Sequence, residues 1–216
     1  MWPALGNPCD MPEMLVWQNW LKPGDLFVDV GAHLGFYTLF ALDHGAEVIA
    51  VEPSSLLAGR IRENLDLNHF AAELIEAGLG ECEGTAHLVG PDHSRSHLIQ
   101  GSSDTITNTV RVTTLDGVLD GRCAAGVKID VEGAEVLVLR GAVESLRAHR
   151  IGLLQLEWNE LSETHHSSER SEIRRLLEDF GYEMLRPDGS GTLVPLGDSH
   201  TGRDVFARAN RSQPSR

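Results

Sequence analysis

The chain has 216 residues, of which 41% are hydrophobic and 23% charged, a composition typical of one globular domain of ordinary size. Acidic residues outnumber basic ones by 32 to 18, which gives a formal net charge of -14. A surface this acidic repels phosphate backbones, so we expect no nucleic-acid partner.

The cysteines and the first residues indicate the compartment. Cys9, Cys82 and Cys123 are far apart and form no C-x-x-C pair, so neither a disulfide framework nor a zinc site is expected. The opening residues contain several prolines and acids and no continuous apolar run. No later segment approaches the roughly 20 apolar residues of a membrane span. We therefore expect a cytoplasmic protein with no membrane partner.

Short apolar runs alternate with helical patterns along most of the chain. Apolar residues at helical spacing follow residue 54, at Leu57, Ile61 and Leu65, and recur over residues 173–180. Strands that alternate with helices predict right-handed crossovers and a doubly wound sheet. Runs this short and apolar suit parallel strands covered on both faces. The expected strands are residues 26–30, 48–51, 73–77, 127–131 and 151–156.

The C-terminal part departs from this pattern. Residues 182–186 and 204–208 are strand-like, and the segment between them is rich in Gly, Asp and Pro and contains no helical pattern. Two strands without a crossover helix must run antiparallel. We therefore predict an α/β fold with a seven-stranded, mostly parallel sheet that ends in a C-terminal antiparallel hairpin. This arrangement separates methyltransferases from plain dinucleotide-binding folds.

A glycine turn follows the first expected strand. Gly31 and Gly35, with Ala32 and His33 between them, lie where an open α/β sheet binds its ligand. Glycine lets the backbone approach a ligand closely, and the next helix offers free N–H groups at its N-terminus. Asp29, just before the turn, is placed to bind a ligand's ammonium group directly or through water.

The acid at the end of the second strand helps to identify the ligand. Glu52 is positioned to accept hydrogen bonds from both hydroxyls of a ribose. A nicotinamide cofactor would require G-x-G-x-x-G around its pyrophosphate, which Asp29 would repel. The same Asp29 attracts a cationic amino acid, so the charges favour S-adenosylmethionine. Pro53, Ala77 and Gly78, which follow neighbouring strands, complete the expected cofactor contacts together with Asp130.

Charged residues gather at the ends of the fourth and fifth strands. Lys128, Asp130 and Glu132 alternate, so they share one face while the chain stays extended. The fifth strand ends with Glu157 and Trp158, and adjacent strand ends lie about 5 Å apart. One of the three carboxylates is therefore expected to act as the general base of a reaction at this edge. Lys128 would orient or neutralise the cluster.

Two other interpretations of these residues remain open. In the first, Lys128 and Asp130 form a structural ion pair, and Glu132 caps the helix that starts at Gly133, where the helix dipole favours an acid. In the second, the strand-end carboxylates hold Mg²⁺ through their oxygens. We expect no metal, although Mg²⁺ remains an alternative.

The loops and the N-terminal segment are expected to select the acceptor. Residues 91–97 form a polar loop before the fourth strand, and loops carry specificity on rigid folds. The residues expected to contact the acceptor are Ser94, Arg95, His97 and Trp158. Residues 1–22 form a separate segment whose helix either packs on the sheet or covers the acceptor pocket as a lid. Residues 23–210 form the main domain, and residues 211–216 a tail.

Several segments together resemble the FkbM family of methyltransferases. They are residues 22–25, 27–38, 51–53, 64–68, 112–116 and 128–135 (KIDVEGAE), the last being the most distinctive. The resemblance implies a Rossmann-like class I methyltransferase in which Asp29, Gly31 and Glu52 contact S-adenosylmethionine. It also implies methylation of a hydroxyl on a natural product or sugar. The family usually has Asn at the position of His33; a ring in place of a short amide changes the shape of the site and, since a free histidine titrates near pH 6.5, is expected to be able to add a charge.

The combined expectation is in-line methyl transfer to a hydroxyl of a small molecule, with a carboxylate as the base. N-methylation of a small amine is one alternative. A non-catalytic module that binds S-adenosylmethionine is another, and the three strand-end carboxylates argue against it. A nicotinamide oxidoreductase is the least favoured enzyme.

Overall fold

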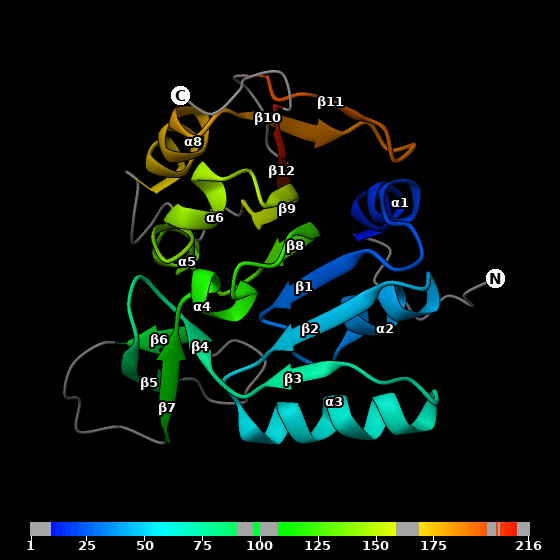
Figure 1. The fold of residues 1–216 in the computed structure, drawn as a ribbon, viewed down its shortest axis with the longest axis vertical. Helices are drawn as coiled ribbons and strands as arrows, with labels where there is room; N and C mark the ends of the chain where they lie inside the picture. The colour runs from blue at the N-terminus through cyan, green and yellow to red at the C-terminus, as the bar shows by residue number, and fades with distance from the viewer. Residues whose placement is uncertain are drawn as a thin grey trace.

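The computed structural model describes residues 10–89, 97–99, 108–158, 169–197, 202 and 204–210. A large sheet of eight strands forms its centre, in the order β11-β10-β12-β9-β8-β1-β2-β3 (Figure 1). These strands are β1 (Leu26–Val30), β2 (Glu47–Val51), β3 (Glu73–Ile75), β8 (Ala124–Ile129), β9 (Ile151–Glu157), β10 (Tyr182–Pro187), β11 (Leu193–Pro195) and β12 (Asp204–Ala209).

The direction of the strands confirms the predicted fold. The five neighbouring strands β9, β8, β1, β2 and β3 are parallel. The strand β12 runs antiparallel between β9 and β10. The predicted number of seven strands is one too low, because β11 adds an edge strand to β10. A tight turn makes this possible: Asp188 Oδ1 accepts the backbone N–H groups of Ser190 (2.9 Å) and Thr192 (3.2 Å).

Helices cover both faces of the sheet (Figure 1). They are α1 (Met11–Trp20), α2 (Phe36–Asp43), α3 (Ser55–Leu67), α4 (Leu115–Leu119), α5 (Glu135–Arg140), α6 (Val143–Arg147) and α8 (Glu169–Asp179). Side chains alternate along β1, so Val28 packs with the residues of α4, α5, α6 and α8. Phe27 points to the other face, where α1 and α2 pack. The start of α3 is capped as its sequence indicates: Ser54 Oγ accepts the Leu57 N–H.

A second, smaller sheet lies beside the carboxyl ends of β1, β2 and β3 (Figure 1). Its strands are ordered β4-β7-β5-β6 and comprise β4 (Gly78–Leu79), β5 (Gly84–Val89), β6 (His97–Ile99) and β7 (Asn108–Thr113). The sequence pattern does not predict this sheet. It forms a separate layer next to the edge where the parallel strands end.

The helix α1 is anchored by Trp17, which is fully buried. Its ring lies 4.9 Å from the Phe27 ring and 5.7 Å from the Phe206 ring, measured between centroids. It also covers Gly126 of β8, where a Cβ would come within 2.3 Å of the ring. Trp17 Nε1 donates a hydrogen bond to Gln155 Oε1. This helix therefore packs on the sheet through the described residues; a lid role for residues 1–22 stays a prediction.

No helix in the described part of the chain is long and apolar enough to cross a membrane.

Replacing Trp17 tests how much this anchor contributes. Trp17→Ala should lower the free energy of unfolding by about 3–5 kcal/mol, because it removes a buried ring from a close-packed layer. Trp17→Phe should lower the stability less than Trp17→Ala, because it keeps an aromatic ring in the layer. Its remaining cost comes from the lost hydrogen bond to Gln155. Urea denaturation of both variants measures the two losses. Equal stability of Trp17→Ala and the wild type would show that α1 is not anchored through this ring.

Candidate active site

The turn after β1 passes very close to the segment after β8. Gly31 has φ +76°, and a Cβ at this position would lie 1.8 Å from the Asp130 carbonyl oxygen. Only glycine avoids this clash with a backbone atom and adopts the left-handed conformation at little cost. The turn is tied to the neighbouring strand, because the N–H groups of Gly31 and Ala32 donate to Val51 O at 3.0 and 3.1 Å. The carboxyl ends of β1, β2 and β8 are thereby brought together.

A cavity of about 190 Å³ opens at this edge. Its lining combines polar groups, from the glycine turn and the strand-end acids, with apolar side chains that include Val51, Leu57, Leu79 and Leu88. The residues predicted to bind the cofactor that line it are Gly31, His33, Glu52, Pro53, Ala77, Gly78 and Asp130. Apolar side chains suit a flat base, and the polar groups suit a ribose and a charged amino acid, so these residues fit S-adenosylmethionine.

Glu52 is held in place at the end of β2 by two backbone groups. His33 N–H donates to Oε2 and Ser54 N–H donates to Oε1, both at 2.9 Å. Burial raises the pKa of Glu52 to about 7, and these two hydrogen bonds oppose the rise. Each oxygen can accept further hydrogen bonds. A carboxylate fixed in this way suits a vicinal diol such as a ribose.

His33 adopts the backbone conformation that the turn requires. Its φ is 55°, in the left-handed region where asparagine and histidine are enriched among the non-glycine residues. Burial lowers its pKa below the ordinary value, so the ring is neutral at neutral pH. The substitution of His for Asn therefore keeps the conformation of the turn and adds no charge to the cavity.

Three of the predicted cofactor residues lie outside the cavity lining: Asp29, Ala32 and Gly35. Asp29 is 1% exposed and accepts a 2.7 Å hydrogen bond from Thr38 Oγ1. Its burial raises its pKa, while Lys128 and Thr38 oppose the rise. Asp29 therefore lies outside the wall of the cavity, and its contact with a cofactor stays a prediction.

Lys128 is a buried cation among acids. Its side chain is 7% exposed, and Nζ lies 2.8 Å from Asp130 Oδ2. Nζ also lies 4.7 Å from the centre of the Tyr37 ring. Burial alone would lower the pKa of Lys128, but Asp130 and Asp29 raise it above its ordinary value, so the group stays charged. This geometry is compatible with the predicted neutralising role of Lys128, which stays a prediction. The ion pair between Lys128 and Asp130 that the alternative interpretation expects is present.

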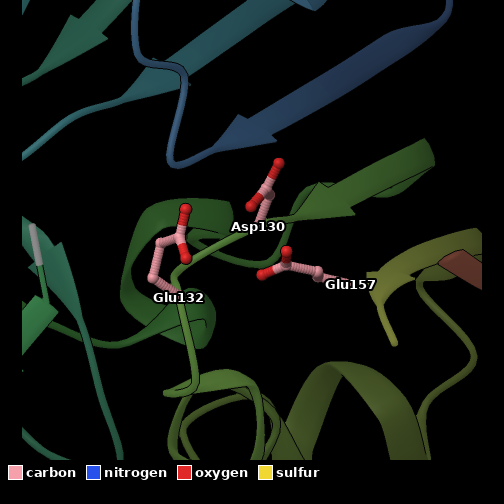
Figure 2. Close-up of side chains that lie close together, drawn as sticks. All are labelled: Asp130, Glu132 and Glu157. Atoms are coloured by element: carbon pink, nitrogen blue, oxygen red, sulfur yellow. The ribbon is translucent and has the colours of Figure 1, made fainter. Parts of the chain in front are cut away.

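Asp130, Glu132 and Glu157 converge, although they come from different segments. Figure 2 shows the three carboxylates close together, and one oxygen from each lies within 4.8 Å of the other two. Asp130 and Glu132 also line the cofactor cavity, whereas Glu157 approaches from the end of β9. This spacing would also let all three acids contact a single cation.

Glu132 reaches the cluster by a different route from the one expected. Alternation of Lys128, Asp130 and Glu132 requires an extended chain past Asp130, but β8 ends at Ile129. Glu132 then adopts φ 53° and Gly133 φ 99°. The chain turns at this point, so a left-handed bend rather than strand alternation directs the Glu132 side chain.

Comparisons with known proteins identify the family of the chain. The model of the methyltransferase FkbM domain matches residues 29–184. The chain belongs to the FkbM methyltransferase family. It is therefore an S-adenosylmethionine-dependent methyltransferase. No curated protein matches the chain.

Solved structures show the same fold at low sequence identity. A precorrin-6y C5,15-methyltransferase from Geobacter metallireducens has a TM-score of 0.53 and 14% identity, over 96% of this chain and 92% of its own. An rRNA methylase from Streptococcus thermophilus has a TM-score of 0.53 and 15% identity, over 95% of this chain and 98% of its own. A magnesium protoporphyrin IX methyltransferase from Synechocystis, solved with bound SAM, has a TM-score of 0.51 and 14% identity, over 93% of this chain and 78% of its own.

Glu135 is a site residue of this FkbM-family chain that the sequence analysis missed. Its Oε1 accepts the N–H groups of Val131 (3.1 Å) and Gly133 (3.4 Å), which bracket Glu132. The side chain is 2% exposed, and burial raises its pKa to about 7. Glu135 is thus a positioning residue for the bend that carries Glu132. Its place in the KIDVEGAE segment was a signal, but only the fold shows its contact.

A row of buried polar groups behind the cluster was also missed. Gln155 lies beside Lys128 in the register of β8 and β9. Its Nε2 donates to Asp204 Oδ2 (2.6 Å) and Tyr37 Oη (3.3 Å). Burial raises the pKa of Asp204 to about 7, with Lys128 and Gln155 opposing the rise. No local pattern links these residues, because strand pairing alone brings β12 next to β9.

The predicted acceptor contacts are only partly visible. Ser94 and Arg95 lie outside the described residues, and His97 is described only as the first residue of β6. Trp158 is 6% exposed and belongs to the main apolar core. It also lines a second cavity, next to α8.

Glu52 should make cofactor binding depend on pH. With a pKa of about 7, the carboxylate is ionised above neutrality and protonated below it. S-adenosylmethionine affinity should therefore weaken as the pH falls from 8 to 6, by up to about tenfold per pH unit below the pKa. Calorimetric titration across this range measures the trend. Glu52→Gln should bind more weakly with a flatter profile; an unchanged profile would assign the titration to another group.

Glu135 should act through the loop that it holds. Glu135→Ala leaves two backbone N–H groups without their acceptor and should cost about 1–3 kcal/mol of stability. It should also lower turnover, since Glu132 loses its support. Glu135→Gln keeps an acceptor oxygen and should restore most of both. Urea denaturation and turnover assays test this pair; a Gln variant as impaired as the Ala variant would contradict the positioning role.

Proposed function

We propose that this methyltransferase transfers a methyl group to a hydroxyl of a small natural product or sugar. The observation that carries this proposal is the convergence of Asp130, Glu132 and Glu157 beside the cofactor cavity. An alcohol must lose its proton as it is methylated, and a positioned carboxylate can take that proton. The cluster thus offers the group that O-methylation needs.

The residues of the cavity would hold the cofactor with its reactive end toward the cluster. Glu52 would bind the ribose, and the apolar residues of the lining would surround the base. S-adenosylmethionine supplies a methyl group on a positively charged sulfur. Asp130 and Glu132 lie between the cavity and Glu157, so the cofactor's amino-acid end and sulfur are directed to the same side as the acids. Alignment of this kind contributes several kcal/mol to a displacement.

Among the three acids, Glu157 is best placed to serve as the base. Asp130 is held by the Lys128 ammonium group at 2.8 Å, which favours its charged form and makes it a weaker proton acceptor. Glu132 lines the cofactor cavity. Glu157 comes from the neighbouring strand and stands on the far side of the cluster, where an acceptor would enter. Taking up a proton there also relieves repulsion among close carboxylates.

The charge of the chain supports a small acceptor rather than RNA. The net charge of -14 opposes the binding of a long phosphate backbone. We also propose that no metal takes part, since Lys128 already supplies a positive charge to Asp130. Cys82 and Cys123 are free and exposed, which suits a reducing compartment such as the cytoplasm.

The variant Glu157→Gln tests the role of the base. It keeps the size of the side chain and removes proton-accepting power, so turnover should fall by about 10²–10⁴-fold. Affinity for S-adenosylmethionine should stay close to that of the wild type, because Glu157 does not line the cofactor cavity. Steady-state kinetics and calorimetry separate the two effects. Glu183→Gln, a matched surface variant on β10, should change neither; full activity of Glu157→Gln would overturn the assignment.

The reaction itself is tested by mass spectrometry with a panel of alcohols, sugars and amines. O-methylation predicts that hydroxylated compounds gain one CH₂ unit of mass when S-adenosylmethionine is present, equally before and after chelation of divalent metals. Transfer to amines only would favour N-methylation, and no transfer at all would favour a binding module. Transfer lost on chelation and restored by Mg²⁺ would show that the acids hold a metal.

A further inference from the structure

The amide of Gln155 joins three elements on the face of the sheet that α1 and α2 cover. The residue is 1% exposed. Its Oε1 accepts a hydrogen bond from Trp17 Nε1, and its Nε2 donates to Asp204 Oδ2 at 2.6 Å and to Tyr37 Oη at 3.3 Å. An indole N–H can only donate, so Oε1 must face Trp17 and the amide NH₂ group must face the other two. The direction of both hydrogen bonds from Nε2 is therefore fixed.

This direction leaves the Tyr37 hydroxyl with a proton to donate. The Gln155 amide uses a lone pair of Oη, and no described residue accepts the O–H of Tyr37. Burial raises the pKa of Tyr37, although Lys128 beside its ring opposes the rise, so the hydroxyl stays protonated. Tyr37 is 6% exposed, and a buried donor without an acceptor is costly. The unused O–H therefore indicates a ligand that brings an oxygen to this position.

The carboxylate of Asp204 lies within reach of the same ligand oxygen. Asp204 Oδ2 and Tyr37 Oη lie 2.6 and 3.3 Å from one nitrogen, so they are at most about 5.9 Å apart. No hydrogen bond joins the two side chains directly. A hydroxyl that accepts from a phenol and donates to a carboxylate spans about 5.5 Å, since O–H···O bonds are about 2.7–2.8 Å long. One bridging hydroxyl thus fits between Tyr37 and Asp204.

This position is next to the proposed base. In the antiparallel pair of β12 and β9, Asp204 stands directly opposite Glu157. Their side chains therefore project to the same face, with Cβ atoms about 5 Å apart. It is also the face of Gln155, two residues before Glu157, because side chains alternate along a strand. Asp204 and Glu157 are both half-buried, so neither is enclosed in the core.

The bridging position belongs to the acceptor side rather than to the cofactor side. Tyr37, Gln155 and Asp204 do not line the cofactor cavity, and neither does Glu157. A ligand that reaches Tyr37 and Asp204 therefore contacts the acidic cluster from the side of Glu157.

We propose that Tyr37 and Asp204 bind a second hydroxyl of the methyl acceptor, so that the acceptor is a diol or polyol rather than a simple alcohol. The O–H of Tyr37 donates to this second hydroxyl, which donates its own proton to Asp204. The reacting hydroxyl, one or two carbons away, then lies at Glu157. Gln155 is a positioning residue that holds both partners. The assignment of the polyol as the methyl acceptor rests on the proposed methyl transfer, whereas the binding of the polyol does not.

The first test measures polyol binding without turnover. Cis- and trans-cyclohexane-1,2-diol, myo-inositol and cyclohexanol are titrated into the full chain in the presence of S-adenosylhomocysteine. The indole N–H signal of Trp17, identified with Trp17→Phe, is followed by nuclear magnetic resonance. This N–H is bonded to the Gln155 amide, so it responds to changes in the hydrogen bonds of Nε2. At least one polyol should give a saturable shift and bind about tenfold or more tightly than cyclohexanol, as expected for one or two added hydrogen bonds.

The two tyrosines provide a variant and its matched control. Tyr37→Phe removes only the hydroxyl and should lower the affinity for the polyol to that for cyclohexanol. Tyr182 is also buried, and its hydroxyl donates to Ile151 O (2.8 Å) at the opposite end of β9. Tyr182→Phe should therefore leave the affinity for the polyol unchanged. Asp204→Asn keeps the size of the side chain, removes its charge and should weaken polyol binding as well.

Three results would overturn the proposal. The first is equal polyol affinity of Tyr37→Phe and the wild type, and the second is the absence of a saturable shift with any polyol. The third is a loss of S-adenosylmethionine affinity in Tyr37→Phe as large as its loss of polyol affinity, since the hydroxyl would then bind the cofactor. Unchanged cofactor affinity, measured by calorimetry, shows that each variant is folded.

The second test compares kcat/KM for the polyol that binds best and for an analogue that lacks one hydroxyl. The wild type and Tyr182→Phe should prefer the polyol by about tenfold or more, and Tyr37→Phe should lose most of this preference. Polyol binding that depends on Tyr37, without any methyl transfer, would keep the site and reject the proposed function. Methyl transfer to hydroxyls without a preference for the polyol would keep the function and reject the site.

Discussion

An ammonium group that leaves water loses hydration worth several kcal/mol, and only acids placed around it offset that loss. Lys128, 5% exposed in the middle of the sheet, meets this condition through Asp130 at 2.8 Å and through Asp29 on the next strand. The same contact fixes Asp130 between the cofactor cavity and the acidic cluster. Removing the cation would leave buried carboxylates without compensation. The positive charge of Lys128 therefore acts on the acids of the cofactor cavity, of the acidic cluster and of the polar row that includes Gln155.

The cofactor side could be predicted from the sequence because it depends on local features. A strand end, a glycine turn and an acid at the next strand end determine where Gly31 and Glu52 lie once the sheet is parallel. The close passage of Gly31 past the Asp130 carbonyl explains why the turn contains a glycine there. Asp29 shows the limit of this reasoning. Its position beside the turn was clear, but its burial behind the turn depends on α2 and Thr38.

The acceptor side depends on contacts between distant segments, and the sequence was less informative there. Glu132 enters the cluster through a left-handed bend held by Glu135, a conformation that strand periodicity does not predict. Asp204 joins the polar row because β12 is inserted antiparallel beside β9. The small sheet that supplies Leu88 to the cofactor cavity contains two strands of only two and three residues, β4 and β6, which are too short for alternation to be recognised. Its other pairing, of β5 with β7, joins segments that are far apart in the chain, and no local pattern reveals it.

The carboxyl edge of the sheet is built to bind S-adenosylmethionine rather than a nicotinamide dinucleotide. Titration calorimetry of the wild-type chain with both cofactors tests it most directly. The arrangement of Gly31, Glu52 and the buried acids predicts one S-adenosylmethionine bound per chain and no measurable heat with NAD. Binding of NAD, with no response to S-adenosylmethionine, would contradict the account.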